Sequence, residues 1–378
     1  MDYRPEFADF EDVAYLNVAN QGPLPLASAR AAQAAIELKK LPYRIEDSLY
    51  FDLPDRVREK IASLIGAVPD EIALTTGASS GMAAVAAGMD WRPGDEVLVA
   101  RGEFPAHFTT WLPYQKAGKL CLRVIAPQDR FISADDYIAH ISPRTRLVSA
   151  SLVRYDDGSR LDAARLGSAC HAANVSLLLD LSQCAAAMPL SIRDLGADFA
   201  VCSGYKWLFG PYGTGFFWVS HDWVDRLVCG PAYWQALDGA RNFHTLPLRD
   251  FRLSSSARRW DSAETANFIN LAALDASLDL LLRVGTAAIV KHNDALMTEI
   301  IERLPRDSCV LASPEERERR GPYVCVAARK PNRTRELLEK LRAAQIIVSL
   351  RENSLRISSH IYNASEHIDR LIRVLSTS

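Results

Sequence analysis

The sequence lacks the features of several protein classes. Seven cysteines are scattered over 378 residues and no two form a Cys-x-x-Cys pair, so a zinc ribbon or a dithiol redox site is not expected. No apolar run approaches the roughly 18 residues that a membrane span needs. The first residues, MDYRPEFADFED, are acidic and polar and do not resemble a cationic and then apolar leader. With the odd number of cysteines, this start leads us to expect a cytoplasmic protein.

An excess of charge of either sign is also missing. Lys and Arg total 44 and Asp and Glu total 46, which leaves a formal net charge of −2. This balance gives no general attraction to nucleic acid or to an anionic membrane, so neither is expected as a partner. A chain of this length can bury about three-quarters of its unfolded surface, so its core needs no disulfides.

Short apolar runs alternate with helical patterns along most of the chain. Strands are predicted at 71–75, 96–100, 120–125, 145–151, 176–180, 199–202 and 215–219. Helices are predicted at 79–88, 106–117, 133–140, 162–173 and around 182–188. This alternation predicts an α/β fold with a mostly parallel, doubly wound sheet. After a Ser- and Arg-rich loop at 253–259, helices are predicted at 265–284 and 287–304, followed by a smaller α+β unit. That unit has predicted strands at 323–328, 346–350 and 354–357 and helices at 334–344 and 365–375.

Ligands of doubly wound sheets bind where strands run into loops, so strand ends are the places to look for chemistry. The loop TTGASSG at 75–81 follows a predicted strand and opens a helix. Its small residues Gly77, Ala78 and Ser79 are typical of a phosphate cradle, or of a plain loop in which Ser79 caps the helix. The loop also resembles the nucleotide loop of short-chain dehydrogenases, but no tyrosine has a lysine four positions later.

Two further strand ends carry opposite charges. Asp180 ends the apolar run SLLLD, and such a buried carboxylate needs a cationic partner unless it only caps a helix. Lys206 lies between a strand end and a glycine-rich turn, among aromatic residues, where desolvation lowers a lysine pKa as imine chemistry requires. One helix and one strand separate the two residues, which places them at neighbouring strand ends.

A fourth strand end carries an aromatic ring. Phe104 follows the strand at 96–100, and it either stacks on a planar ligand or belongs to the core, with His107 as a plain helix residue. A lysine for an imine, an acid for a ring nitrogen, a stacking ring and a phosphate cradle together indicate pyridoxal 5′-phosphate as the cofactor.

The sequence also resembles the class V aminotransferase family of fold-type I pyridoxal-phosphate enzymes, which includes relatives such as cysteine desulfurases and isopenicillin N epimerase. The segments that carry the resemblance are YLNVANQGPLP at 15–25, DLSQ at 180–183, SGYK at 203–206, GPYGTG at 210–215, RWDSAETANF at 259–268 and LRISSHIYN at 355–363. The resemblance implies a large cofactor-binding α/β domain at 16–262 and a small α+β domain formed by 1–15 and 263–378.

The resemblance also implies roles for individual residues. Lys206 would be the Schiff-base lysine and proton shuttle, and Asp180 would hold the ring nitrogen. Gln183 would lie near the phenolic oxygen and Phe104 would stack on the ring. The remaining implied cofactor-binding positions are Gly77, Ala78, Ser79, Ser203, Tyr205 and Thr265, of which Thr265 would reach the phosphate of a partner subunit. Glu264 stands where the family has glycine, so the local turn is open to question.

For the substrate, the resemblance implies that Arg356 holds the α-carboxylate, in the bidentate geometry that arginine provides. Asn20, in the N-terminal motif, is counted with it as a substrate-binding residue. Arg154 follows the strand at 145–151, where relatives hold Asn or Gln near the ring. It would either bind an acidic substrate side chain or be neutralised by Asp156 and Asp157.

These expectations favour amino-group transfer between an amino acid and a 2-oxo acid. A lyase or an amino-acid epimerase on the same scaffold stays open, and so does a non-catalytic binding protein, against which the Asp180 and Lys206 pair argues. A cysteine desulfurase is disfavoured because no cysteine follows Cys325, which lies within a predicted strand. The family also implies a homodimer with active sites shared between subunits. No metal is expected.

Overall fold

The computed structural model describes residues 2–228, 230, 232–242, 245, 251–330 and 332–377. Its centre is a seven-stranded sheet with the order β2-β8-β7-β6-β5-β3-β4. The strands are β2 (Ile72–Thr75), β3 (Glu96–Ala100), β4 (Cys121–Ile125), β5 (Thr145–Ser151), β6 (Ser176–Asp180), β7 (Phe199–Ser203) and β8 (Gly215–Val219). Pairs that do not involve β8 are parallel, whereas β8 is antiparallel to both of its neighbours. The expected mostly parallel α/β fold is confirmed.

Both faces of this sheet are covered, and the strand sequences explain why. Successive side chains point to opposite faces, so Leu177 and Leu179 of β6 join one hydrophobic cluster while Leu178 joins another. The first cluster packs under α2 (Leu49–Ile65), α7 (Ala163–Ala172) and α9 (Phe268–Val284). The second packs under α3 (Ala78–Gly88), α4 (Ala106–Thr109) and α8 (His221–Val224). Continuous apolar strands are therefore stable here because neither face meets water.

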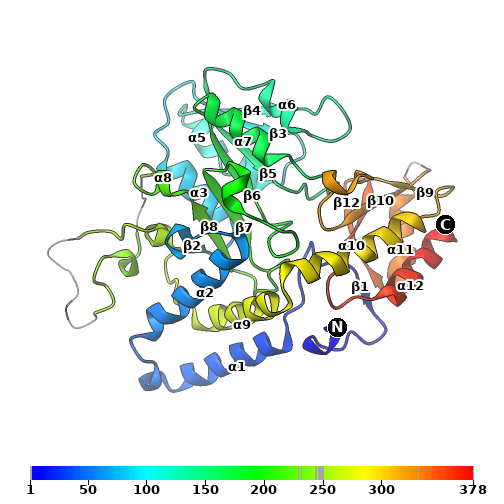
Figure 1. Cartoon of the computed structure of the whole chain (residues 1–378), viewed down its shortest axis with the longest axis horizontal. Coiled ribbons are helices and arrows are strands. Elements are labelled where there is room, and N and C mark those ends of the chain that lie inside the picture. Colours follow the sequence, from blue (N-terminus) through cyan, green and yellow to red (C-terminus); the bar gives the residue numbers. More distant parts are fainter. Residues whose placement is uncertain are drawn as a thin grey trace.

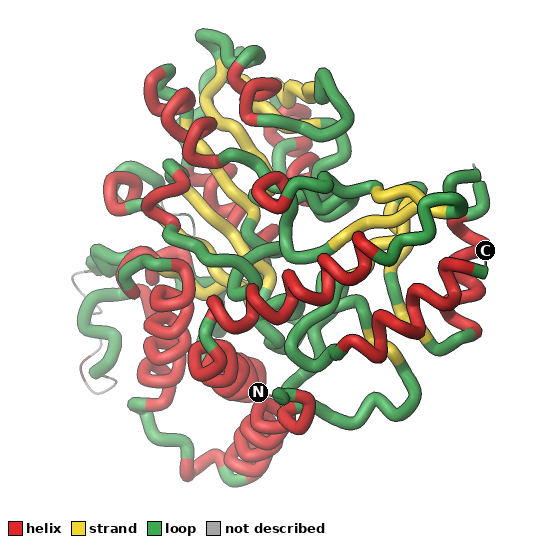
Figure 2. Tube along the Cα trace, turned by 45° about the vertical axis from the view of Figure 1, so that its right-hand side comes forward, coloured by secondary structure: helices red, strands yellow, loops and turns green. Residues whose placement is uncertain are grey.

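The N-terminal helix α1 (Leu26–Lys40) lies along α9, as both views show (Figure 1, Figure 2). The two helices meet through the hydroxyls of Ser28 and Ser277, 2.8 Å apart. Two short helices, α5 (Leu112–Lys116) and α6 (Ala134–Ile138), lie near the β3–β4 edge of the sheet (Figure 1).

A smaller antiparallel sheet with the order β12-β13-β10-β9 lies beside the large one (Figure 1). Its strands are β9 (Cys309–Leu311), β10 (Val324–Ala328), β12 (Ser349–Arg351) and β13 (Ser354–Ile357). It shares a hydrophobic cluster with α10 (Thr286–Glu302), α11 (Thr334–Ala343) and α12 (Ser365–Ser376). The short strand β1 (Ala14–Tyr15) pairs in parallel with β11 (Ile346–Ile347), so the start of the chain is attached to its last third.

The structure differs from the sequence predictions at several places. The strand predicted at 346–350 is divided into β11 and β12, which belong to different sheets, and β9 was not predicted. The helix predicted at 106–117 is split into α4 and α5, because Pro113 suits only the first turn of a helix. The stretch 182–188 forms turns, with Ala186 in a left-handed conformation (φ 64°) that a helix cannot accommodate. Helices α1 and α2 were not predicted. None of the helices in the described ranges has the length and hydropathy needed to cross a lipid bilayer.

Candidate active site

Asp180, Ser203 and Lys206, three of the residues singled out in the sequence, lie at one edge of the large sheet. Strands β5, β6 and β7 are parallel, so their carboxyl ends lie side by side. Asp180 is the last residue of β6, and Ser203 is the last residue of β7, three positions before Lys206. Such an edge is the usual ligand site of doubly wound sheets.

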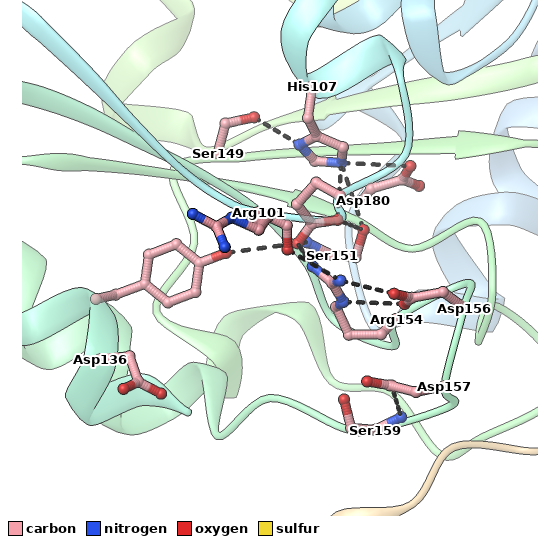
Figure 3. A network of polar contacts seen from close by, with 12 residues as sticks. Arg101, His107, Asp136, Ser149, Ser151, Arg154, Asp156, Asp157, Ser159 and Asp180 are labelled. Atoms are coloured by element: carbon pink, nitrogen blue, oxygen red, sulfur yellow. Dashed lines mark hydrogen bonds and ion pairs between the residues drawn. The ribbon is translucent and has the colours of Figure 1, made fainter. Parts of the chain in front are cut away.

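Asp180 is buried and is held in a defined orientation. One carboxylate oxygen, Oδ1, accepts a hydrogen bond of 2.8 Å from the backbone N–H of Ser182. The other, Oδ2, lies 3.7 Å from Nε2 of His107 (Figure 3). Burial, the largest single influence, acts to raise the pKa of Asp180, but the interactions with His107, Lys206 and Ser182 together outweigh it, and the pKa is lowered overall. Asp180 is therefore a buried carboxylate that stays ionised.

His107 links Asp180 to a second buried carboxylate. Its Nδ1 is 2.8 Å from Oγ of Ser149, and its Nε2 is 3.9 Å from Oε2 of Glu103. Burial acts against the charged ring, but Glu103 and Asp180 outweigh this effect and raise the pKa of His107. A fully buried imidazolium between two carboxylates is consistent with the geometry.

Arg154 belongs to the same network and not to the cavity around Lys206. Its guanidinium makes two hydrogen bonds to Asp156, of 2.9 and 3.2 Å (Figure 3). Its Nη1 lies 3.6 Å from Oε1 of Glu103. Neighbouring carboxylates thus neutralise the charge of Arg154. Of the two alternatives that the sequence left open, the geometry favours neutralisation, by Asp156 and Glu103. Asp157 makes its hydrogen bond of 2.7 Å to the backbone of Ser159 instead.

Six of the predicted residues line one cavity of about 100 Å³: Asn20, Phe104, Gln183, Tyr205, Lys206 and Arg356. Burial, the largest influence, lowers the pKa of Lys206 to about 8, and the positive charges of Arg356 and Arg351 add to this effect while Asp180 opposes it. A lysine with such a pKa is partly neutral at physiological pH and can act as a nucleophile or a base. The cavity therefore contains a reactive amine.

Aromatic rings surround the amine. The ring centroid of Phe104 is 5.4 Å from Nζ of Lys206, and that of Tyr205 is 5.5 Å away. Tyr155, a cavity residue that the sequence did not single out, meets Phe104 edge to face at 5.4 Å. Phe104 is 39% exposed and lines the cavity, so part of its side chain is accessible to a ligand.

Gln183 is fixed from two sides. Its Nε2 donates to the carbonyl of Ala19 at 3.0 Å, and its Oε1 accepts from Nε1 of Trp207 at 3.0 Å. The N-terminal motif also approaches the lysine loop, since the backbone N–H of Gly22 donates to the carbonyl of Tyr205 at 2.9 Å. A Cβ on Gly22 would lie 2.1 Å from the carbonyl oxygen of Lys206, so only glycine fits there.

Arg356 is almost fully buried in β13 and is only partly satisfied. Its Nη1 donates to the carbonyl of Tyr155 at 3.0 Å, but its Nε is buried without a hydrogen-bond partner among the residues that the structure describes. Burial lowers the pKa of Arg356, and the charge of nearby Arg351 adds to the shift. An unsatisfied buried guanidinium is costly, and an anionic ligand would supply the missing interaction.

The glycine-rich loop adjoins this site. Gly77 precedes α3, and the backbone N–H of Ala78 donates to Oγ of Ser203 at 3.3 Å. A Cβ on Gly215 would come within 2.7 Å of Cα of Gly77, so the two backbones need glycine to approach this closely. Ser79 lies in the first turn of α3, whose N-terminal amides favour an anion.

Thr265 lies apart from the lysine cavity. It lines a different hollow, together with Thr76, Gly213 and Glu264, and its hydroxyl donates to the carbonyl of Ser262. Glu264 has a φ of 57°, the left-handed conformation that glycine favours. The turn therefore has a glycine-like backbone although glycine is absent.

Sequence reasoning missed Arg351 as a cavity residue and left His107 as a plain helix residue. A signal for His107 was its spacing from Glu103, since residues four apart on a helical turn are neighbours. A signal for Arg351 was the short connection at 351–353 between the strands predicted at 346–350 and 354–357, since so short a connection makes a hairpin that brings Arg351 near the strand of Arg356.

Comparisons with known proteins agree with this geometry. The sequence model of the family "Aminotransferase class-V" matches residues 50–371. A probable cysteine desulfurase of Methanothermobacter thermautotrophicus is 29% identical over 79% of this chain and 74% of that protein. Isopenicillin N epimerase of Streptomyces clavuligerus is 27% identical over 96% of this chain and 94% of that protein.

Among solved structures, a mutant of C-DES with glycine covalently linked to its PLP cofactor superimposes with a TM-score of 0.89. The match covers 100% of this chain and 99% of that one, at 21% sequence identity. At this level of identity the likeness concerns the fold.

Proposed function

Since this chain belongs to the class-V aminotransferase family of pyridoxal-phosphate-dependent enzymes, we propose that it transfers an amino group from an amino acid to a 2-oxo acid. The observation that carries the proposal is the cavity in which Lys206, with a pKa of about 8, lies beside the incompletely bonded Arg356. The amine of Lys206 can form an imine with a carbonyl group or take up a proton, and Arg356 can bind a carboxylate. Amino acids and 2-oxo acids both carry the carboxylate, next to a carbon that bears a transferable proton or a carbonyl group.

The donor set fits the cofactor. Asp180, kept ionised by His107, would hold a protonated ring nitrogen, and Phe104 would cover the face of the ring. Gly77, Ala78, Ser79 and Ser203 would hold the phosphate, a role supported by the close backbone approach at Gly77 and the helix start that follows it. Gln183 and Tyr205 complete the set of residues that we assign to the cofactor, and both line the cavity.

Bound pyridoxal phosphate supplies an electron sink for the bond broken at Cα of the substrate. The residues of this chain supply the rest. Arg356 would bind the α-carboxylate and so orient Cα toward Lys206, which would take up and return the Cα proton. Asn20, at the edge of the cavity, would contact the substrate.

The thiols of this chain argue against desulfuration. Cys325 is buried in β10, and burial raises the pKa of its thiol to about 12. Within the described ranges, no cysteine lines the lysine cavity. A persulfide-forming cysteine needs an accessible thiolate, so amino transfer is the better-supported activity, with β-elimination and epimerisation at Cα as alternative reactions.

We further propose a cytoplasmic homodimer in which Thr265 of each subunit completes the phosphate site of the other. Thr265 lies in a hollow beside Thr76 and Gly213, close to the glycine-rich loop but outside the lysine cavity. Size-exclusion chromatography with light scattering tests the dimer. Replacing Thr265 with alanine should weaken cofactor binding without changing the oligomeric state.

The experiment for the activity is a spectrum of the purified holoenzyme before and after single amino acids are added. Transfer predicts that the visible cofactor band bleaches with an amino acid and returns when a 2-oxo acid is added. Release of ammonia and pyruvate without an acceptor would replace transfer by β-elimination. Exchange of the Cα proton with solvent deuterium, without consumption of substrate, would replace it by epimerisation. Failure of added pyridoxal phosphate to produce any band would overturn the proposal.

A further inference from the structure

Arg351 and Arg356 lie on the same face of the small sheet. In the β12–β13 hairpin, Ser349 pairs with Arg356 and Arg351 pairs with Ser354. Residues two apart on a strand share a face, so the two arginines are diagonal neighbours with two serines completing the square. Diagonal side chains of this kind have Cα atoms about 7–8 Å apart, within reach of long side chains. Both arginines line the cavity of Lys206.

No carboxylate neutralises Arg351 among the described residues. Its Nη2 donates to Oδ1 of Asn20 at 2.8 Å and its Nη1 to the carbonyl of Leu350 at 2.9 Å, and both acceptors are neutral. The next residue, Glu352, is exposed and forms no ion pair within the described ranges. Arg154 is different, because it forms ion pairs with Asp156 and Glu103. Arg351 is thus a cation without a counter-charge at the edge of the site.

Two like charges on one sheet face repel each other. Asp180 is the carboxylate that acts on Lys206 from within the sheet, and it already faces His107. Within the described ranges, no carboxylate forms an ion pair with Arg351 or Arg356 in the cavity. A ligand with two negative groups would compensate both, whereas a monocarboxylate would compensate one.

We propose that Arg351 binds a second acidic group, so that the substrates are amino acids and 2-oxo acids with an acidic side chain. This inference rests on the proposed function and adds its substrate class. Arg356, buried and with an open Nε, takes the α-carboxylate, while the partly exposed Arg351 takes the side-chain acid at the entrance. Asn20 holds the guanidinium of Arg351 toward the cavity. We thus assign to Arg351 the binding of an acidic substrate side chain, which the sequence left open for Arg154.

Unreactive carboxylates test this inference without relying on turnover. Binding of glutarate, succinate, butyrate and propionate to the holoenzyme is measured by isothermal titration calorimetry. We expect glutarate to bind wild type at least about tenfold more tightly than butyrate, and succinate more tightly than propionate, because each monocarboxylate lacks the second carboxylate of its partner. R351Q should lose this preference and keep its affinity for monocarboxylates within about twofold. R356Q should bind both classes more weakly.

Two further variants serve as controls for R351Q. R351K keeps the charge but not the planar fork, so it should retain part of the preference. R335Q removes an exposed arginine on α11 outside the cavity and should behave as wild type. Equal weakening of both ligand classes by R351Q would overturn the inference, since Arg351 would then share the α-carboxylate. An unchanged preference in R351Q, or a wild type without preference, would overturn it as well.

The outcomes separate this inference from the proposed function. A wild type that transfers amino groups from alanine as efficiently as from aspartate or glutamate would refute the substrate class and leave amino transfer standing. A holoenzyme that prefers dicarboxylates through Arg351 but transfers no amino group would refute amino transfer and leave the recognition role standing.

Discussion

Nε2 of His107 lies 3.7 Å from Oδ2 of Asp180, and neither side chain is open to solvent. The same imidazole is 3.9 Å from Glu103, which in turn is 3.6 Å from Arg154. The proposed cofactor-binding carboxylate is therefore the last member of a buried network of alternating charges. Its ionisation is favoured by His107, which does not line the substrate cavity, as well as by Lys206, which does.

Replacing His107 with asparagine should remove the cation between two buried carboxylates. Breaking a buried pair in this way lowers the free energy of unfolding by about 3–5 kcal/mol. Chemical denaturation at pH 6 measures the loss. The matched control is H171N, because His171 is half exposed, lies 3.5 Å from Asp198 and should contribute less than about 1 kcal/mol. A loss in H107N no larger than in H171N would contradict a charged His107.

The difference in unfolding free energy between wild type and H107N should depend on pH in a predictable direction. The pKa of His107 is raised above 6.5, so its contribution is complete below pH 6.5 and is lost as the pH rises through the raised value. The pKa of Asp180 is lowered below 3.8, so its contribution is present above that pH and is lost as the pH falls. The difference in unfolding free energy between wild type and H107N should be largest between pH 3.8 and 6.5 and should become smaller as the pH rises above the raised pKa of His107.

Uptake of pyridoxal phosphate by the apoprotein should follow the ionisation of Lys206. The neutral amine is the reactive form, so the rate should rise with pH, with a midpoint near the pKa of about 8. Stopped-flow absorbance after mixing measures it. The K206A variant should develop no visible absorption band when pyridoxal phosphate is added. D180N removes the charge that opposes the lowered pKa, so its midpoint should move to lower pH; a midpoint that stays fixed or rises would contradict the assigned influence.

Much of this site was predictable from the sequence because its residues lie at strand ends. Apolar strands such as SLLLD mark the sheet edge, and loops at that edge necessarily meet. The parallel order of β5, β6 and β7 then brings Asp180 and Lys206 together. Glu264 shows the limit of this reasoning, because its left-handed backbone occurs although the glycine that would predict it is absent.

The sequence could not predict with which residue each charged side chain forms an ion pair or a hydrogen bond. Arg154 precedes two aspartates, and the sequence left both the neutralised and the ligand-binding alternatives open. Only the fold shows that Asp156 makes the two-point contact while Arg351, some two hundred residues away, faces the cavity. Likewise, α1 and α2 became helices through packing on α9.

Replacing Gly22 with alanine should displace the lysine loop. The new Cβ would lie 2.1 Å from the carbonyl oxygen of Lys206 and 2.8 Å from the ring of Phe209. Overpacking of this kind lowers stability by about 1–3 kcal/mol, and we expect cofactor affinity to fall by at least about tenfold because Lys206 moves. Thermal unfolding and cofactor titration measure both. G230A, where a Cβ meets nothing within 4 Å, is the control and should match wild type.

The reactivity of two cysteines offers a test that bears on the type of reaction. Cys121 is exposed, whereas Cys325 is buried with a thiol pKa raised to about 12, so almost none of it is thiolate at pH 7.5. Brief treatment of the native holoenzyme with iodoacetamide, followed by peptide mass spectrometry, should label Cys121 and spare Cys325. C325S should retain amino transfer within about twofold, because its thiol takes no part in that chemistry. Rapid labelling of Cys325, together with loss of activity in C325S and sulfide release from cysteine, would instead make this thiol a sulfur acceptor and the enzyme a desulfurase.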